Sequence, residues 1–422
     1  MKLIYTFLFS IVIVFLNAQT SYASFVNPFI GTGGAGHTFP GAVLPFGMVQ
    51  LSPDTRIDGS WEGCGGYHYS DSTIYGFTHT HLSGTGVSDY GDILIMPTLQ
   101  KSNFNNKTNA AKFSHLKEKA SAGFYEVTLN NNVNVKLTAT QRVGIHQYNF
   151  PKMDTATIVL DLLHRDKTLN CTLKIVDSVT VIGSRISEAW ANEQYVYFIM
   201  KFNKPIIYEK INHQIVSKTI GEKEKNTGAY FQFDNRDGKP LLIKVAISQT
   251  STDGAKLNLE TEATHWDFEK YKLEERTWEK ELSKIEIQTT DTEKKIIFYT
   301  ALYHCFIHPS LAGDVDGKYR GRDLLVHQAI GFTPYTVFSL WDTFRGLHPL
   351  FTIVEQKRTT DIINTFLQQH KESGRLPMWE LSANETNCMI GFHSVSVIAD
   401  AITKGITGFD KNKIYKSFYL NT

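Results

Sequence analysis

The chain has 422 residues, of which 42% are hydrophobic, so it is long enough for two or three domains with real cores and is not a disordered sequence. It has 43 lysine and arginine residues against 42 aspartate and glutamate residues, a formal net charge of +1. This balance excludes an electrostatic argument for binding nucleic acid or an anionic membrane, and we expect neither as a partner.

The N-terminus, residues 1–23, is predicted to be a secretory signal peptide rather than part of the fold. A short basic start precedes an apolar run over residues 3–16, and Ser21 and Ala23 supply the small residues of a cleavage site after Ala23. A membrane anchor is the alternative, but the run is shorter than the ~20 residues that a spanning helix needs. We therefore expect an exported protein, secreted, periplasmic or on the cell surface, with no membrane span after processing.

Residues 24–260 have the pattern of an antiparallel β-sandwich, because short alternating runs end in turn residues. The runs at residues 125–129 and 133–138 flank three asparagines, residues 130–132, which is typical of a β-hairpin. Further strands are expected at residues 157–162, 179–182, 195–202 and 241–248.

The pattern changes at residue 261, where the apolar residues take helical spacing. Residues 262–284 are predicted to form a connecting helix within a linker over residues 261–290, and an α-rich domain to begin over residues 291–422. Its expected helices are one capped by Asp291 that runs to about His304, one over residues 360–372 that stops near Gly374, and one over residues 392–404 that stops at Gly405. Because so few helices would leave apolar faces exposed, we expect the start of a longer helical domain.

The four cysteines, Cys64, Cys171, Cys305 and Cys388, are too far apart for a CxxC zinc or redox motif. Export permits disulfides, and the spacing leaves both disulfides and buried thiols open.

Three histidines, His68, His79 and His81, suggest a metal site, and His79 and His81 would share one face of a strand. The sequence has no clear third or fourth ligand at a matching spacing. The preferred interpretation is therefore that these histidines are packed in the protein or face the substrate. The metal ligands stay unassigned.

Two pairs of tryptophan and carboxylate, Trp341–Asp342 and Trp379–Glu380, are the sharpest chemical features. An indole can stack on the apolar face of a sugar, and a carboxylate can accept hydrogen bonds from two neighbouring hydroxyls. Core packing for each tryptophan and a cap or ion pair for each acid are the alternatives. From the residues alone, Glu380 and Glu385 would be the two acids that glycoside hydrolysis requires.

Several ordered motifs together resemble glycoside hydrolase family 92. They lie at residues 26–33 (VNPFIGTG), 45–55 (PFGMVQLSPDT), 65–69 (GGYHY), 81–86 (HLSGTG), 339–345 (SLWDTFR) and 384–401 (NETNCMIGFHSVSVIADA). The resemblance implies an α+β multidomain fold, with an N-terminal sandwich like that of galactose mutarotases followed by part of an (α/α)6 barrel. It also implies a calcium-dependent (Ca2+), inverting exo-α-mannosidase that removes terminal mannose, with α-1,2 linkage as the first expectation, from glycans such as high-mannose N-glycans.

The resemblance implies roles for individual residues. Trp341 and Asp342 match positions that bind the terminal mannose. Trp61 matches, more loosely, a position that contacts the neighbouring sugar. Glu380 and Glu385 lie in matched motifs and are further substrate-binding candidates. The strings that carry the general acid, the general base and much of the calcium site in this family are absent, so we expect these groups beyond residue 422 and assign no catalytic residue. The alternative is an inactive fragment that only binds mannosides.

Overall fold

The computed structural model describes residues 21–99, 104, 106–214, 225–273 and 276–419, so most of the predicted signal peptide lies outside the described residues. Its last residues lie inside them. A short 3-10 helix, η1 (Tyr22–Phe25), packs beside two helices of the second half of the chain. Tyr22 and Ala23 donate their backbone N–H groups to the carboxylate of Glu279, at 3.0 and 3.1 Å. Residues on both sides of the predicted cleavage point therefore contact the fold.

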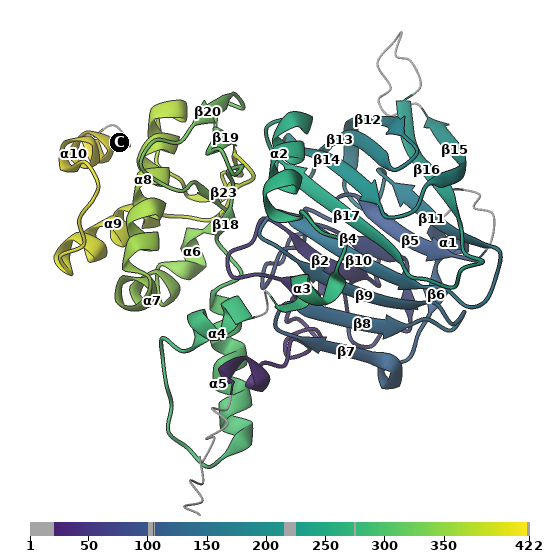
Figure 1. The fold of residues 1–422 in the computed structure, drawn as a ribbon. Coiled ribbons are helices and arrows are strands. Elements are labelled where there is room, and N and C mark those ends of the chain that lie inside the picture. The colour runs from purple at the N-terminus through teal and green to yellow at the C-terminus, as the bar shows by residue number, and fades with distance from the viewer. Residues whose placement is uncertain (1–20, 100–103, 105, 215–224, 274–275, 420–422) are drawn as a thin grey trace, which may run out of the picture.

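The first half of the chain is a β-sandwich of two antiparallel sheets, as predicted (Figure 1). The seven-stranded sheet has the spatial order β1 (Ala42–Val43), β2 (Gln50–Asp54), β4 (Gly76–Thr78), β5 (Leu94–Thr98), β11 (Thr155–Asp161), β16 (Lys225–Asp234) and β15 (Ile206–Gln214). The eight-stranded sheet has the order β12 (Lys167–Asp177), β13 (Thr180–Glu188), β14 (Gln194–Phe202), β17 (Leu241–Ser248), β10 (Val143–Asn149), β9 (Asn134–Ala139), β8 (Phe124–Thr128) and β7 (Glu118–Ser121). Shorter elements are η2 (Trp61–Gly63), β3 (Thr73–Ile74), α1 (Asn106–Asn109), β6 (Ala111–Lys112) and η3 (His115–Lys117).

The predicted hairpin is confirmed. Strands β8 and β9 pair antiparallel with Val127 opposite Val135, and Asn132 in the turn has a φ of 63°, a value that asparagine tolerates better than most residues. The other four predicted strands correspond to β11, β13, β14 and β17.

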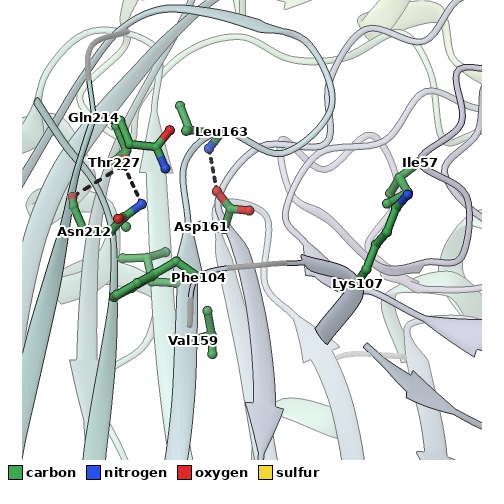
Figure 2. Close-up of a pocket in the computed structure, with 11 residues that line it drawn as sticks. Ile57, Phe104, Lys107, Val159, Asp161, Leu163, Asn212, Gln214 and Thr227 are labelled. Atoms are coloured by element: carbon green, nitrogen blue, oxygen red, sulfur yellow. Dashed lines mark hydrogen bonds between the residues drawn. The ribbon is translucent and has the colours of Figure 1, made fainter. Parts of the chain in front are cut away.

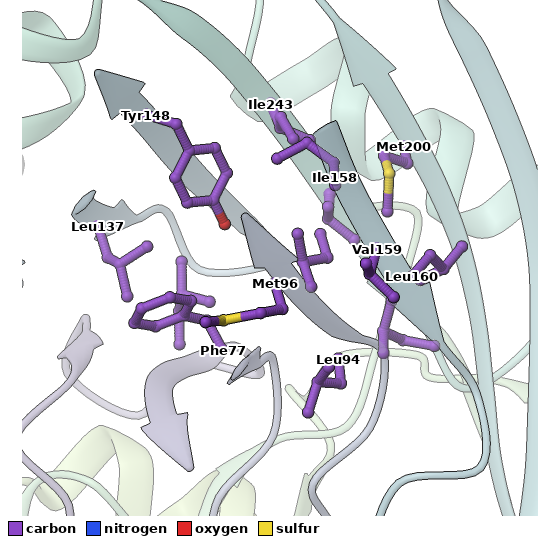
Figure 3. Close-up of a cluster of buried hydrophobic side chains, with 14 of the residues drawn as sticks. Phe77, Leu94, Met96, Leu137, Tyr148, Ile158, Val159, Leu160, Met200 and Ile243 are labelled. Carbon is purple, nitrogen blue, oxygen red and sulfur yellow. The ribbon is translucent and has the colours of Figure 1, made fainter. Parts of the chain in front are cut away.

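The sandwich core lies between the two sheets (Figure 3). Phe77, Met96 and Ile158 from one sheet and Tyr148 and Ile243 from the other are fully buried in it. Full burial of each large apolar side chain contributes about 1.5–3 kcal/mol, so the alternating pattern of these strands supplies the driving force for the sandwich.

The single helix predicted over residues 262–284 is wrong. The structure instead has α2 (Thr252–Glu262), α3 (Phe268–Lys272) and α4 (Arg276–Leu282), and residues 274–275 lie outside the described residues. Asp267 begins a new helix because its side chain accepts the N–H of Lys270, at 3.4 Å. The sequence also missed α2, which follows the last strand and packs Ala255 and Leu259 onto the eight-stranded sheet. The helical part of the chain therefore begins at Thr252 rather than after residue 260.

The second half is helical, with small sheets on the side that faces the sandwich (Figure 1). Its elements are α5 (Thr292–Cys305), β18 (Ser310–Leu311), β19 (Lys318–Arg320), β20 (Val326–Gln328), β21 (Tyr335–Thr336), β22 (Phe338–Ser339), α6 (Leu340–Thr343), α7 (Leu347–Val354), α8 (Gln356–Ser373), β23 (Trp379–Leu381), β24 (Asn384–Glu385), α9 (His393–Thr403) and α10 (Lys411–Tyr419). The predicted caps are confirmed: Asp291 accepts the N–H of Lys294 at 3.2 Å, and Gly374 and Gly405 both have φ 79° after their helices.

A second core joins the two halves. It contains helical residues such as Phe351, Ile362 and Phe366 together with Val43 and Phe46 of the sandwich. All four cysteines are free thiols, two of them buried and two half-buried. Among the described residues, no helix combines the length and the apolar character that a bilayer crossing requires.

Candidate functional site

Trp61 lies on a loop of the sandwich, in the short helix η2. Its indole is 58% exposed, so it does not serve as a core residue. The edge of the ring meets His37, with centroids 4.2 Å apart and planes at 90°, and a Cβ at Gly86 would come within 2.7 Å of the indole Nε1. These neighbours hold the ring in place while part of it stays open to solvent, which suits stacking on a sugar. The sequence pattern did not single out His37.

Trp341 and Asp342 lie together on the single turn of α6, at the edge of the helical half. The Ser339 hydroxyl donates to an Asp342 carboxylate oxygen at 2.7 Å, and the Asp342 side chain remains exposed. Trp341 is half-buried, with His393 edge-on at 5.7 Å and the guanidinium of Arg345 5.3 Å from its ring centroid. The tryptophan and the carboxylate are thus held in fixed orientations beside each other.

Glu380 on β23 is buried, and its carboxylate already has partners inside the protein. One oxygen accepts hydrogen bonds from the Thr336 hydroxyl at 2.8 Å and the Ala383 N–H at 2.6 Å, and the other accepts the Val337 N–H at 3.2 Å. Burial raises the pKa of Glu380 to about 7 despite these donors. Its observed contacts join β23 to the segment that leads into β22.

Glu385 lies opposite Glu380, on the neighbouring strand β24. Its carboxylate accepts the backbone N–H groups of Met378 and Trp379, both at 2.9 Å, and it forms an ion pair with Arg322 at 3.3 Å. These contacts favour a positioning role for both glutamates. The expectation that they contact a sugar stays a prediction.

Polar contacts connect the sandwich directly to the sheet β22–β23–β24. Tyr90 and Ser382 share a hydrogen bond of 3.0 Å between their hydroxyls. The Asn384 side chain accepts the N–H of Glu193 at 3.1 Å and donates to its carbonyl oxygen at 2.9 Å. The sheet beside Trp341 is therefore anchored to the loops of the other half of the protein.

Trp190, which follows β13, adds an aromatic contact at the same junction. Its ring meets Trp379 edge-to-face, and the carboxylate of Asp89 accepts the N–H groups of Trp190 and Ala191 at 3.1 and 2.8 Å. Val87 lies in the same apolar cluster as Trp379. Because Val87 follows Gly86, the packing of Trp61 is linked through one short loop to the helical half. No sequence signal marked Trp190 or Asp89.

The three histidines considered as metal ligands do not gather around one point. The Nε2 of His79 lies 2.9 Å from the Nε2 of His146, the Nε2 of His81 lies 3.5 Å from the carboxylate of Asp54, and His68 hydrogen-bonds a nearby serine. Burial lowers the pKa of His79 to about 4, so this ring is neutral. Within the part of the chain that the structure describes, no group of three or more His, Cys, Asp or Glu side chains could hold a metal ion.

Cavities in the sandwich differ in how near they lie to the predicted site residues. A groove of about 580 Å³ lies over β11, β15 and β16, where Asp161, Asn212 and Thr227 line it (Figure 2), and none of the predicted site residues is among its lining residues. A pocket of about 310 Å³ lies beneath the loop that carries Trp61, and its lining includes Ser60 and Gly63 on either side of that tryptophan. The second cavity therefore adjoins the candidate site.

The described residues offer an exposed indole on the sandwich and, on the helical half, an indole beside an exposed carboxylate. Aromatic faces and charged hydrogen-bond acceptors are the groups that recognise a pyranose, which has an apolar C–H face and a rim of hydroxyls. The geometry suits carbohydrate binding, and the buried glutamates support the strands that carry it.

The family comparisons agree with this chemistry. The model of the glycosyl hydrolase family 92 N-terminal domain matches residues 25–248, and the model of the glycosyl hydrolase family 92 catalytic domain matches residues 254–422. A secreted glycosidase of Arthroderma benhamiae, itself uncharacterized, is 24% identical over 420 residues, which are 91% of this chain and 50% of that protein.

Solved structures give the same result. A family GH92 α-mannosidase from Bacteroides thetaiotaomicron, solved in complex with mannoimidazole, is 36% identical, with a TM-score of 0.88 over 95% of this chain and 55% of that chain. A family GH92 inverting mannosidase from the strain VPI-5482 of the same species is 29% identical, with a TM-score of 0.85 over 95% and 55%. The chain thus spans about half the length of these relatives.

Proposed function

The chain belongs to glycosyl hydrolase family 92, and from this premise we propose that the protein hydrolyses terminal α-linked mannose residues of glycans. The observation that carries the proposal is the pair Trp341 and Asp342 on one turn of helix. The indole would stack on the terminal mannose, and the exposed carboxylate, oriented by Ser339, would accept two of its hydroxyls. Two relatives described as α-mannosidase or mannosidase support the choice of sugar.

The finer parts of the proposal are linkage and stereochemistry. We take α-1,2-linked mannose, as at the ends of high-mannose N-glycans, as the first substrate, with Trp61 contacting the sugar next to the cleaved bond. An inverting reaction needs a general acid and a general base about 6.5–9.5 Å apart, with a water molecule between the base and the sugar. Glu380 and Glu385 already have internal partners, so we assign neither of them to these roles.

Calcium dependence is proposed from the family resemblance alone. Calcium takes six to eight oxygen ligands, several of them carboxylates. The residues that the structure describes do not provide such a group, so we derive no catalytic step through the ion. We also propose export from the cell, which the signal-like N-terminus and a relative described as secreted support.

The decisive experiment is the release of mannose from α-1,2-mannobiose by the purified chain, with calcium and with a chelator. Calcium-dependent release would support the proposal in full. Release in both conditions would support mannosidase activity and remove calcium from it. A folded chain that binds mannobiose without cleaving it would favour the second candidate, a mannoside-binding protein. A folded chain that neither binds nor cleaves would overturn both.

A further inference from the structure

The pocket of about 310 Å³ beneath the Trp61 loop is a candidate binding site in its own right. Its volume lies at the lower end of the roughly 300–1,000 Å³ that small-molecule sites occupy. Its walls come from the loop at residues 56–63, from residues 165–167 at the start of β12, from Ser88, and from residues 188–189 at the end of β13. Four segments that are distant in the sequence thus converge on one cavity.

Asp166, one of the residues that line the pocket, has a buried polar atom that the fold does not use. Asp166 is only 8% exposed, and its Oδ2 has no hydrogen-bond partner among the residues that the structure describes. A buried carboxyl oxygen without a partner costs about 1–3 kcal/mol, so folding alone gives no reason to keep an acid here. Burial raises the pKa of Asp166 to about 8, and at neutral pH the group is mainly a carboxylic acid that can both donate and accept a hydrogen bond. A sugar hydroxyl has the same dual capacity.

The charged groups around the pocket argue against an ionic ligand. Arg56 is paired with Asp71 at 3.1 Å, Arg165 contacts the carboxylate of Asp54 at 3.4 Å, and Lys167 is paired with Glu188. Each cation is therefore already engaged with a carboxylate. An anion would have to compete with these pairs. The lining also includes the acidic residues Asp58 and Glu188, so the basic and acidic side chains roughly balance and a neutral ligand rich in hydroxyls fits best.

The backbone at this point is held in an uncommon conformation. Arg165 has a φ of 63°, and its side chain passes so close to Gly66 and Gly91 that a Cβ at either glycine would lie within 2.8 Å of it. Non-glycine residues in this region cost about 1–3 kcal/mol and occur preferentially at binding sites. Asp166 follows directly, so this conformation helps to set where its carboxyl group lies.

The pocket also adjoins the segments that carry Trp61 and Trp190. The loop that forms one wall carries Trp61, and the segment at Glu188 leads directly to Trp190 at the junction with the helical half. Ser88 precedes Asp89, which holds the backbone of Trp190. The pocket is therefore built on the same loop as Trp61 and beside the segment that leads to Trp190.

We propose that this pocket is a further sugar subsite, in which Asp166 hydrogen-bonds a hydroxyl of a mannose unit beyond the one that contacts Trp61. The inference rests on the proposed mannosidase function and adds a preference for oligosaccharides longer than a disaccharide. The subsite binds without cleaving, so its effect appears in affinity and KM rather than in the chemical step.

The test compares sulfur-linked, hydrolysis-resistant α-1,2-mannobiose and mannotetraose by isothermal titration calorimetry. The tetraose should bind about tenfold more tightly, the equivalent of ~1.4 kcal/mol or one to two good hydrogen bonds. Asp166→Ala should remove this gain and leave mannobiose affinity unchanged, while Asp166→Asn, which keeps a donor and an acceptor, should retain part of it. Asp237→Ala, an exposed aspartate elsewhere on the sandwich, is the control and should retain all of it.

Ser88→Phe gives a second route if the Asp166 variants do not fold, because Ser88 is exposed and a larger side chain there would narrow the pocket. Equal affinities for the two ligands, or a gain that survives the substitutions at both positions, would overturn the subsite while leaving the proposed function in place. Absence of binding by either ligand to folded protein would count against both proposals together.

Discussion

The indole of Trp190 from the sandwich lies against the indole of Trp379 from the helical half, with ring centroids 5.9 Å apart and planes at 71°. Such edge-to-face pairs contribute about 0.5–1.5 kcal/mol beyond the area they bury. Trp190 is 39% exposed and Trp379 is buried, so the pair joins a surface hairpin to a strand inside the other half. The sheet beside the candidate mannose site thus depends on a residue from a separate part of the chain.

Removal of the Trp190 ring should weaken the junction between the two halves. We expect Trp190→Ala to lower the free energy of unfolding by ~1–3 kcal/mol, and Trp190→Phe to recover most of the loss because it keeps an aromatic edge. Urea denaturation followed by circular dichroism measures this. Trp266→Ala is the matched control, because Trp266 is similarly exposed and stacks on Lys244 within the sandwich region. Equal losses in the two alanine variants would show that the junction has no special role.

Asp342 should matter for turnover rather than for folding. If the protein cleaves α-mannosides, Asp342→Ala should lower kcat/KM by an amount equal to ~2–4 kcal/mol, because sugar hydroxyls lose a charged acceptor. The unfolding midpoint should hardly change, since the side chain is exposed and bonds only to Ser339 among the described residues. Asp316→Ala, on an exposed hairpin, is the control. Unchanged kinetics in Asp342→Ala would remove Asp342 from the mannose site.

Glu385 should behave in the opposite way, as a positioning residue. Glu385→Ala leaves two backbone N–H groups and the buried Arg322 without their acceptor, and loss of one partner of a buried ion pair costs about 3–5 kcal/mol. We expect a fall in stability of this order, measured by denaturation. Glu385→Gln should retain part of the stability because its amide oxygen still accepts. A Glu385→Ala protein of normal stability that binds mannobiose poorly would show instead that Glu385 contacts the sugar.

Asp166 should make stability depend on pH. Burial raises its pKa to about 8, with Arg185 and Arg165 opposing the shift and Asp89 and Asp92 reinforcing it. A raised pKa means that the folded state binds the proton more tightly than the unfolded state. Proton binding by Asp166 therefore stabilises the folded state. Its contribution to the free energy of unfolding is fully present below the usual pKa of 3.8 and is lost as pH rises through about 8, with a slope of at most ~1.4 kcal/mol per pH unit.

The Asp166→Asn variant isolates this effect. Its stability relative to the natural protein should increase steadily between pH 5 and pH 8, measured by urea denaturation at each pH. The stability of Asp237→Asn, a substitution on the surface, should change with pH in the same way as that of the natural protein. A constant difference between Asp166→Asn and the natural protein across that range would show that Asp166 is ionised throughout.

The N-terminal contacts predict a difference between two starting points. A chain that begins at Ser21 should be ~1–2 kcal/mol more stable than one that begins at Ser24, because it keeps the hydrogen bonds to Glu279 and the ring of Tyr22 against Tyr299, 5.3 Å between centroids. Thermal unfolding of the two chains measures the difference, and Glu279→Ala should reduce it. Equal stabilities of the two chains would show that cleavage after Ala23 removes no stabilising contact.

The local parts of the fold could be predicted from neighbouring residues. The hairpin at Asn132, the cap at Asp291 and the helix ends at Gly374 and Gly405 each depend on the conformational preferences of a few adjacent residues, and each is present. Helix α2 escaped notice because it contacts the sheet mainly through Ala255 and Leu259, too few apolar positions to stand out from the polar residues around them.

The sequence by itself determined the order of a β-sandwich and a helical half, the family through its ordered motifs, and Trp61, Trp341 and Asp342 as sugar-binding candidates. Only the tertiary structure decided how the carboxylates are used: Glu380 and Glu385 meet backbone donors and Arg322, whereas Asp342 stays exposed and Asp166 is buried beside a cavity. The reason is physical. A residue type specifies which bonds a side chain can make, but burial and the presence of partners from distant segments decide whether those bonds are made within the protein or left for a ligand.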